Sequence, residues 1–118
     1  MGICRCMSAI GEAVPFNMLS DQSGEIGKAY GVYNEEDAIE TRGSFIIDPD
    51  GVLQCGDILT PPVGRNIDEL FRLFQAYQLV RRTQAEEVCP VNWEPGKKTL
   101  KPCPSLVSNV WKEWKLED

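Results

Sequence analysis

The chain has 118 residues, a formal net charge of −6 and no histidine. This length suits one domain, and an acidic chain whose Lys and Arg are scattered argues against a nucleic-acid partner, because phosphates attract clustered cations. The lack of histidine excludes Ser-His-Asp and Cys-His nucleophile pairs and every zinc site that needs imidazole. Any catalysis must therefore rest on thiols, carboxylates, Arg or Lys.

Targeting signals are weak. No apolar run is long enough to cross a bilayer, and the N-terminus lacks the apolar region of a secretory signal. Met1 and Gly2 suggest an acylated start, but Cys6 stands where that pattern requires Ser or Thr. Five cysteines without a secretion signal indicate a reducing compartment. We expect a cytoplasmic protein with no membrane partner.

The first predicted elements lie between residues 14 and 31. Residues 14–19 are apolar without helical spacing and predict a short strand. A helix follows, for which Ser20 and Asp21 supply the N-cap and which Gly31 ends. The acidic residues after it are interpreted as a solvated loop: Glu35, Glu36, Asp37 and Glu40.

The middle of the chain gives the strongest structural signals. Residues 44–47 and 52–55 predict two strands, and Pro49-Asp50-Gly51 between them predicts the turn of an antiparallel hairpin. Asn66 then caps a helix whose apolar residues recur at helical spacing. These residues are Ile67, Leu70, Phe71, Phe74, Tyr77 and Val80.

The composition changes from Arg81 onward. Polar residues dominate, and four prolines prevent long regular structure: Pro90, Pro95, Pro102 and Pro104. We expect an extended arm rather than core. Its end, residues 110–116, carries Trp111 and Trp114 at helical spacing.

Four segments, taken in order, resemble the C-terminal portion of the typical 2-Cys peroxiredoxins, the family of alkyl hydroperoxide reductase C and thioredoxin peroxidase. Each motif alone is modest, but all four at the family's spacing are specific, and they cover roughly residues 14–103. The segments are Phe16-Asn17-Met18-Leu19-Ser20-Asp21 with Tyr30-Gly31-Val32-Tyr33, then Arg42-Gly43-Ser44-Phe45-Ile46-Ile47-Asp48-Pro49-Asp50-Gly51, then Pro62-Val63-Gly64-Arg65-Asn66-Ile67-Asp68-Glu69 with Phe74-Gln75-Ala76-Tyr77-Gln78, and finally Glu87-Val88-Cys89-Pro90 with Asn92-Trp93 and Pro95-Gly96.

The resemblance implies an α/β, thioredoxin-like fold, a mixed sheet flanked by helices, here incomplete. Residues 1–80 would form a partial peroxiredoxin domain and residues 81–118 the C-terminal arm. It also implies reduction of hydrogen peroxide and organic hydroperoxides through cysteine thiols, a thioredoxin-like reductant, homodimers or rings of dimers, and no cofactor.

The family's Pro-x-x-x-Thr-x-x-Cys pattern, which carries the peroxidatic cysteine, does not occur in this sequence. We therefore expect a truncated peroxidase that keeps the resolving half. The alternative is an inactive fragment that serves as an assembly or binding module, so whether the chain is itself an enzyme stays open.

The resemblance assigns Cys89 to the resolving cysteine. In the family this thiol attacks the sulfenic acid of the peroxidatic cysteine, and a dithiol reduces the resulting disulfide. A Pro-rich, mobile arm would let the thiol reach a partner subunit, and no cation cluster in the sequence predicts a strongly lowered pKa. Without the surrounding motif, a structural or surface cysteine would be the simpler interpretation.

Two arginines match family positions near the peroxidatic sulfur. Arg42 corresponds to the active-site arginine, whose guanidinium stabilises the thiolate and the developing charge on the peroxide oxygen. Arg65 corresponds to a second position, for which support of the site and a role at the helix entry are equally open.

The other cysteines carry weaker hypotheses. Cys55 is expected as a core or edge thiol on its strand. A disulfide between Cys89 and Cys103 is conceivable but would compete with resolving. A zinc site from Cys4, Cys6, Cys89 and Cys103 has poor spacing, so we expect no metal.

The apolar residues of the hairpin and the long helix are expected to form the core: Phe45, Ile46, Ile47, Phe71, Phe74 and Tyr77. A sheet without its early strands would nevertheless expose apolar faces and unpaired edges. We therefore expect the chain alone to be marginally stable or to aggregate.

Overall fold

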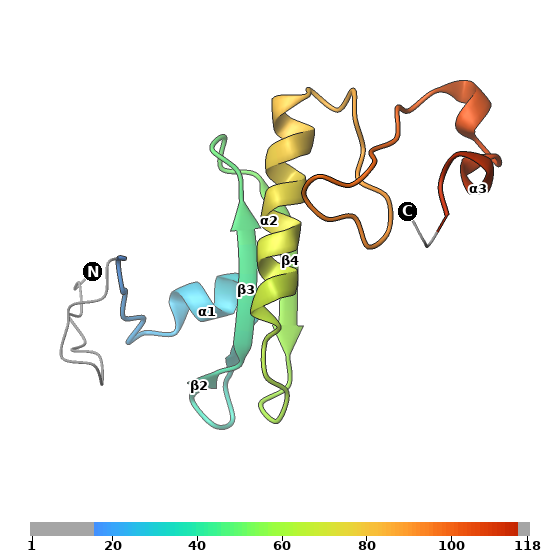
Figure 1. Cartoon of the computed structure of the whole chain (residues 1–118). Coiled ribbons are helices and arrows are strands. Elements are labelled where there is room, and N and C mark those ends of the chain that lie inside the picture. Colours follow the sequence, from blue (N-terminus) through green and yellow to red (C-terminus); the bar gives the residue numbers. More distant parts are fainter. Residues whose placement is uncertain (1–15, 116–118) are drawn as a thin grey trace. The chain divides into compact units, whose positions relative to one another are not determined.

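A computed structural model of the chain describes residues 16–115 (Figure 1). They belong to two compact units. The first comprises the described residues up to Phe45 together with Gly56–Val63, and the second comprises Ile46–Cys55 together with the chain from Gly64 onward. No helix in the described part of the chain is both long and apolar enough to span a membrane.

The first unit opens with the short helix α1, Glu25–Ala29. Its N-cap is Gly24, in a left-handed conformation with φ of +69° that favours glycine. The carboxylate of Asp21 still accepts a hydrogen bond from the N–H of Gly27, at 2.8 Å. The predicted helix is thus confirmed, but it begins later than its predicted cap. The strand predicted over residues 14–19 begins outside the described residues, and the described part contains only a one-residue bridge at Leu19.

Two short strands follow, β1 at Tyr33–Asn34 and β2 at Ile39–Glu40, and they pair antiparallel. The acidic residues between them are exposed, as predicted, whereas Glu40 belongs to β2. A small apolar cluster lies nearby, where Val32 is 8% exposed and the rings of Tyr30 and Phe45 are 4.6 Å apart.

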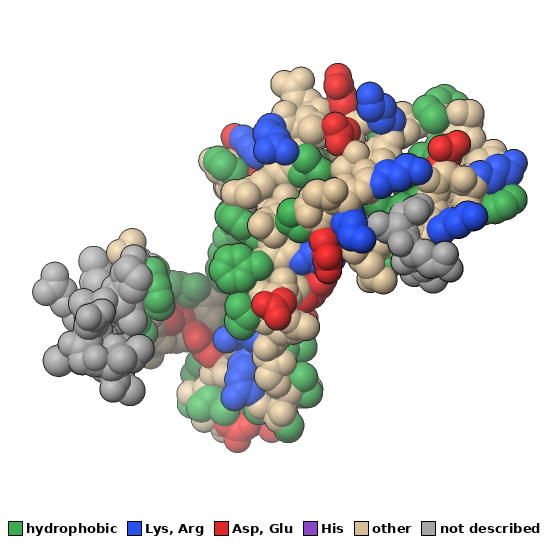
Figure 2. Space-filling model, viewed as in Figure 1, with side chains coloured by type: hydrophobic (Ala, Val, Ile, Leu, Met, Phe, Trp, Pro, Cys, Tyr) green, Lys and Arg blue, Asp and Glu red, His purple; other side chains and the backbone are tan. Residues whose placement is uncertain are grey.

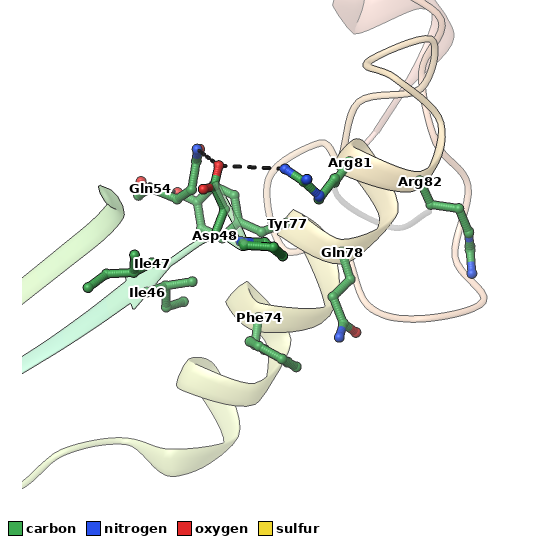
Figure 3. Close-up of a pocket in the computed structure, with 10 residues that line it drawn as sticks. Ile46, Ile47, Asp48, Gln54, Phe74, Tyr77, Gln78, Arg81 and Arg82 are labelled. Carbon is green, nitrogen blue, oxygen red and sulfur yellow. Dashed lines mark hydrogen bonds and ion pairs between the residues drawn. The ribbon is translucent and has the colours of Figure 1, made fainter. Parts of the chain in front are cut away.

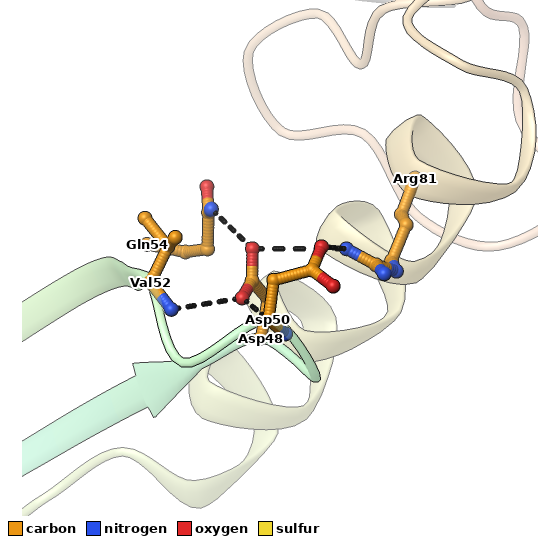
Figure 4. Close-up of polar contacts among 5 residues, drawn as sticks. All are labelled: Asp48, Asp50, Val52, Gln54 and Arg81. Atoms are coloured by element: carbon orange, nitrogen blue, oxygen red, sulfur yellow. Dashed lines mark hydrogen bonds and ion pairs between the residues drawn. The ribbon is translucent and has the colours of Figure 1, made fainter.

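The predicted hairpin is confirmed by β3, Arg42–Ile47, which pairs with β4, Leu53–Leu59. Its turn belongs to the second unit and is organised by Asp48. This carboxylate accepts the N–H groups of Asp50 and Val52, each at 2.9 Å, and the side-chain amide of Gln54 at 2.9 Å (Figure 4). Gly51 supplies the left-handed position, with φ of +81°.

The long helix is also confirmed, as α2 from Ile67 to Arg82. Asn66 caps it, because its side chain accepts the N–H of Glu69 at 3.1 Å. Within the second unit α2 runs beside the turn end of the hairpin (Figure 1), where the hydroxyl of Tyr77 donates to the carbonyl of Gln54 at 3.0 Å.

The segment after α2 is compact, which corrects the prediction of an arm without core. Val88 and Leu100 form an isolated antiparallel bridge, and Trp93 and Leu100 are 5% and 7% exposed. Prolines prevent regular structure here, but a closed loop satisfies its polar groups locally and can bury apolar side chains. A short 3-10 helix, η1 at Pro104–Leu106, and the helix α3 at Val110–Glu113 complete the described chain.

The predicted core is largely wrong. Phe71 is 62% exposed, Ile47 47% and Phe74 46%, while Phe45, Ile46 and Tyr77 are half-buried. A two-stranded hairpin and one helix provide too few packing partners to cover each other's apolar faces. The expectation of exposed apolar faces is therefore confirmed, and Figure 2 shows such side chains at the surface. Marginal stability stays a prediction.

Candidate functional site

Cys89 lies in a closed loop, residues 87–100, which we call the clasp. Next to it, Val88 and Leu100 exchange two backbone hydrogen bonds of 2.8 and 3.0 Å, and the carbonyl of Pro90 accepts the N–H of Trp93 at 3.1 Å. The half-buried Cys89 thiol faces the carbonyl oxygen of Ala76 on α2, at 4.0 Å. The thiol is therefore held against a helix.

Arg72 ties the clasp to α2. Its guanidinium donates to the Glu69 carboxylate through Nε at 2.6 Å and Nη2 at 2.8 Å, and its Nη1 donates to the carbonyl of Trp93 at 3.0 Å. Inside the clasp, the indole Nε1 of Trp93 donates to the carbonyl of Lys97 at 3.1 Å. One arginine thus connects a fixed carboxylate on the helix with the buried centre of the clasp.

The charge state of Cys89 follows from this setting. Burial raises the pKa of the thiol above its ordinary value, the positive charge of Arg72 acts against that rise, and Glu87 adds to it. The result agrees with the expectation that no cation cluster lowers this pKa strongly. At neutral pH Cys89 is mainly a thiol, and its thiolate is a minor species.

Arg42 lies in the first unit, at the exposed start of β3, and its guanidinium donates to the carbonyl of Pro61. Arg65 lies in the second unit and is exposed, directly before the cap residue of α2. Arg42 and Cys89 therefore belong to different compact units.

Three cysteines in the described part of the chain are free thiols: Cys55, Cys89 and Cys103. The structure contains no disulfide between Cys89 and Cys103, and this conceivable pairing stays a hypothesis. Cys55 lies half-buried on β4, while Cys103 is exposed, and a hydrogen bond with Ser105 lowers the pKa of its thiol. Cys4 and Cys6 of the zinc hypothesis lie outside the described residues, and within residues 16–115 no three metal-ligating side chains gather.

The second unit also contains a groove of about 750 Å³ between the hairpin turn and α2 (Figure 3). Arg81 reaches across it to Asp50, at 2.7 Å, and to Asp48, at 3.7 Å, whereas Arg82 points away from the hairpin. These polar groups bind one another, so we interpret them as a structural tie between turn and helix.

Two sequence profiles match the chain. The AhpC/TSA family matches residues 5–55, and the C-terminal domain of 1-Cys peroxiredoxin matches residues 76–115. The chain is 55% identical over 105 residues to the selenocysteine-containing peroxiredoxin PrxU of Peptoclostridium acidaminophilum, covering 89% of this chain and 52% of the relative. It is 50% identical over 88 residues to a thioredoxin peroxidase of Trypanosoma brucei rhodesiense, covering 75% and 43%. The chain belongs to the peroxiredoxin family.

Solved structures confirm the thioredoxin-like fold. The reduced 2-Cys peroxiredoxin of Plasmodium vivax matches with a TM-score of 0.69 at 31% identity, covering 78% of this chain and 48% of that one. A yeast mitochondrial 1-Cys peroxiredoxin, solved to explain its thiol resolving mechanism, matches with a TM-score of 0.68 at 26% identity, covering 86% and 50%. This peroxiredoxin chain thus spans about half the length of the relatives it matches.

The matches and the predicted site residues overlap in part. Cys89 lies within the C-terminal domain match and Arg42 within the AhpC/TSA match, while Arg65 falls between them. Sequence reasoning missed Arg72. Its spacing of three residues from Glu69 indicates a helical ion pair, but no sequence signal connects it to the carbonyl of Trp93, 21 residues later.

Proposed function

We propose that this chain contributes the resolving half of a peroxiredoxin-type thiol peroxidase, with Cys89 as the resolving cysteine. A peroxidatic thiolate attacks the O–O bond of hydrogen peroxide or an organic hydroperoxide, which releases water or an alcohol and leaves a sulfenic acid. The Cys89 thiolate attacks that sulfur, and the sulfenic oxygen leaves as water after taking a proton. A thioredoxin-like dithiol then reduces the disulfide and is itself oxidised.

The observation that carries the proposal is the setting of Cys89. Cys89 lies in a loop closed by two backbone hydrogen bonds, and its thiol faces the carbonyl of Ala76 on α2. The positive charge of Arg72 favours its thiolate. Cys89 also lies within the segment that matches a peroxiredoxin C-terminal domain. Because the clasp holds the thiol against α2, release of the clasp must precede attack on another subunit.

Arg42 is proposed as the guanidinium that stabilises negative charge at the peroxidatic sulfur. For Arg65, support of that site and a role at the entry of α2 are equally open. Donation from Arg42 to the Pro61 carbonyl fixes its side chain, which suits a charge that must be positioned in advance. Homodimers or rings of dimers and a cytoplasmic location complete the proposal.

Trapping of a mixed disulfide tests the resolving role directly. A typical 2-Cys peroxiredoxin whose own resolving cysteine is replaced by serine would be oxidised with one equivalent of hydrogen peroxide and mixed with this chain. We expect a disulfide through Cys89, identified by peptide mass spectrometry. The Cys89→Ser variant should form none, and the Cys103→Ser variant should react like the unaltered chain.

Peroxide consumption with thioredoxin and its reductase tests whether the chain also supplies a peroxidatic sulfur. No turnover with the unaltered chain or with Cys89→Ser is the expected result for a resolving half alone. Turnover that the Cys89→Ser variant loses would mean that another cysteine, such as Cys4 or Cys6, performs the peroxidatic step.

A further inference from the structure

We propose that Arg72 is a positioning residue for Cys89, which both docks the clasp on α2 and places a positive charge beside the resolving thiolate. This inference rests on the proposed resolving role of Cys89. It assigns one side chain two linked effects: Arg72 limits access to the thiol and favours the ionised form that reacts.

The docking effect follows from the geometry of the guanidinium. Its planar fork donates twice to Glu69 and once to the Trp93 carbonyl, an arrangement that a lysine ammonium cannot reproduce. The Arg72 side chain is 23% exposed, and its partner residue Trp93 is 5% exposed. The bond to the clasp is therefore largely shielded from water, where a charge-assisted hydrogen bond is strongest.

The electrostatic effect depends on every charge that faces the thiol. Arg72 on α2 favours the Cys89 thiolate, whereas Glu87 of the clasp and burial oppose it. The interaction is reciprocal, because Cys89 and Glu94 both add to the raised pKa of Arg72, after the larger effect of Glu69. Glu69 thus orients the guanidinium while it offsets part of its charge.

These two effects change the reaction in opposite directions, so they can be separated. A thiol reacts through its thiolate, so the midpoint of a rate–pH profile reports ionisation, while the plateau at alkaline pH reports access. Removal of Arg72 should raise the plateau because the clasp opens. Opening also relieves the burial that raises the pKa of Cys89, so the effect of the charge appears as a difference in midpoint between a variant that loses the charge and one that keeps it.

The test is iodoacetamide alkylation of Cys89 in the full chain, from neutral to strongly alkaline pH, followed by mass spectrometry of the Cys89 peptide. Arg72→Gln should raise the plateau rate by about tenfold, the effect of losing one charge-assisted hydrogen bond, and its midpoint should lie at higher pH than that of Arg72→Lys. Arg72→Lys keeps the charge but not the fork, so its plateau should rise in the same way while its midpoint lies at lower pH than that of Arg72→Gln.

Arg82→Gln is the matched control, because Arg82 is an exposed arginine of the same helix that points away from the hairpin (Figure 3). It should leave both midpoint and plateau unchanged. Helix content measured by circular dichroism establishes that the Arg72 variants fold. A folded Arg72→Gln variant with the plateau of the unaltered chain and the midpoint of Arg72→Lys would overturn the inference.

Failure of the proposed function gives a different result. If Cys89 of the unaltered chain forms no mixed disulfide with an oxidised peroxiredoxin, its resolving role is wrong. The alkylation profile would still show whether Arg72 controls this thiol. If the mixed disulfide forms at the same rate with Arg72→Gln as with the unaltered chain at both neutral and alkaline pH, Arg72 does not serve the resolving step.

Discussion

Two regions of the second unit bury apolar side chains in opposite ways. The α2 helix is long and regular, yet Phe71 and Phe74 on it are 62% and 46% exposed. The clasp has no helix and only a one-residue bridge, yet Trp93 and Leu100 in it are 5% and 7% exposed. Periodicity therefore predicts which element forms, whereas burial depends on how many partners surround it.

The clasp closes because its own polar groups are satisfied at short range. The carbonyls of Pro90 and Lys97 accept the backbone N–H and the indole N–H of Trp93, and the Glu87 carboxylate accepts the hydroxyl of Thr99 at 2.6 Å. Such bonds allow a loop to exclude water from one large side chain. In contrast, α2 satisfies its backbone internally and depends on other segments to cover its apolar face.

The largest expected effect comes from removing the side chain at the centre of the clasp. Trp93→Ala should lower the free energy of unfolding of the clasp by about 3–5 kcal/mol, the usual cost of deleting a buried aromatic side chain. Hydrogen exchange at the amides of Val88 and Leu100 would measure this loss, and alkylation of Cys89 should become faster in parallel.

Trp111→Ala is the control for that experiment, because Trp111 is 68% exposed. Its effect on the same amides should stay within about 0.5 kcal/mol. Equal effects of the two substitutions would show that the clasp is not a separate packed region, and the contrast with α2 would then disappear.

A smaller effect is expected at the start of α2. Asn66→Ala removes the side chain that accepts the N–H of Glu69, and should lower the free energy of unfolding by about 1 kcal/mol. Circular dichroism during urea unfolding would measure it. Asn66→Ser keeps a capping oxygen and should lose much less, whereas an equal loss in both variants would mean that the cap does not stabilise the helix.

The turn of the hairpin should respond weakly to acid. The pKa of Asp48 is lowered, mainly because the N–H of Val52 donates to its carboxylate, with further donation from Gln54 and Asp50. A lowered carboxyl pKa contributes stability that is present above the ordinary pKa and is lost as pH falls through the folded-state value. Asp48→Asn should remove this acid dependence, observed in the NMR amide signals of Gly51 and Val52.

The exposed carboxylate of Asp57 on β4 provides the comparison for the turn. Asp57→Asn should leave the acid response of the two amides intact. Loss of that response in Asp57→Asn but not in Asp48→Asn would show that another group controls it.

Sequence alone predicted the local elements well. Gly51 at a left-handed turn position and Asn66 at a helix cap act through their neighbours in the chain, so the sequence contains the needed information. The resemblance likewise led to the thioredoxin-like fold, because its motifs lie along the chain in a fixed order. The order of motifs could not show which apolar faces would remain uncovered.

The site was predicted less completely. Cys89 was proposed through its motif, and its half-buried position against α2 raises the pKa of its thiol, in agreement with the expectation that no cation cluster lowers this pKa strongly. The compact clasp and the role of Arg72 were not predicted, because both depend on a contact between residues 72 and 93 that neither spacing nor composition indicates. The number of prolines correctly excluded long helices but wrongly suggested an absence of core.

The smallest expected effect on stability concerns the exposed face of α2. Phe71→Glu should change the free energy of unfolding by less than about 0.5 kcal/mol, because a side chain that is 62% exposed has little packing to lose. The same substitution should reduce self-association, since large exposed apolar patches promote contacts between molecules. Gln75→Glu adds an equal charge at an exposed polar position of the same helix, and sedimentation velocity would compare the two variants with the unaltered chain. If Phe71→Glu instead destabilises the chain strongly, α2 has a packed face after all, and its difference from the clasp is one of degree.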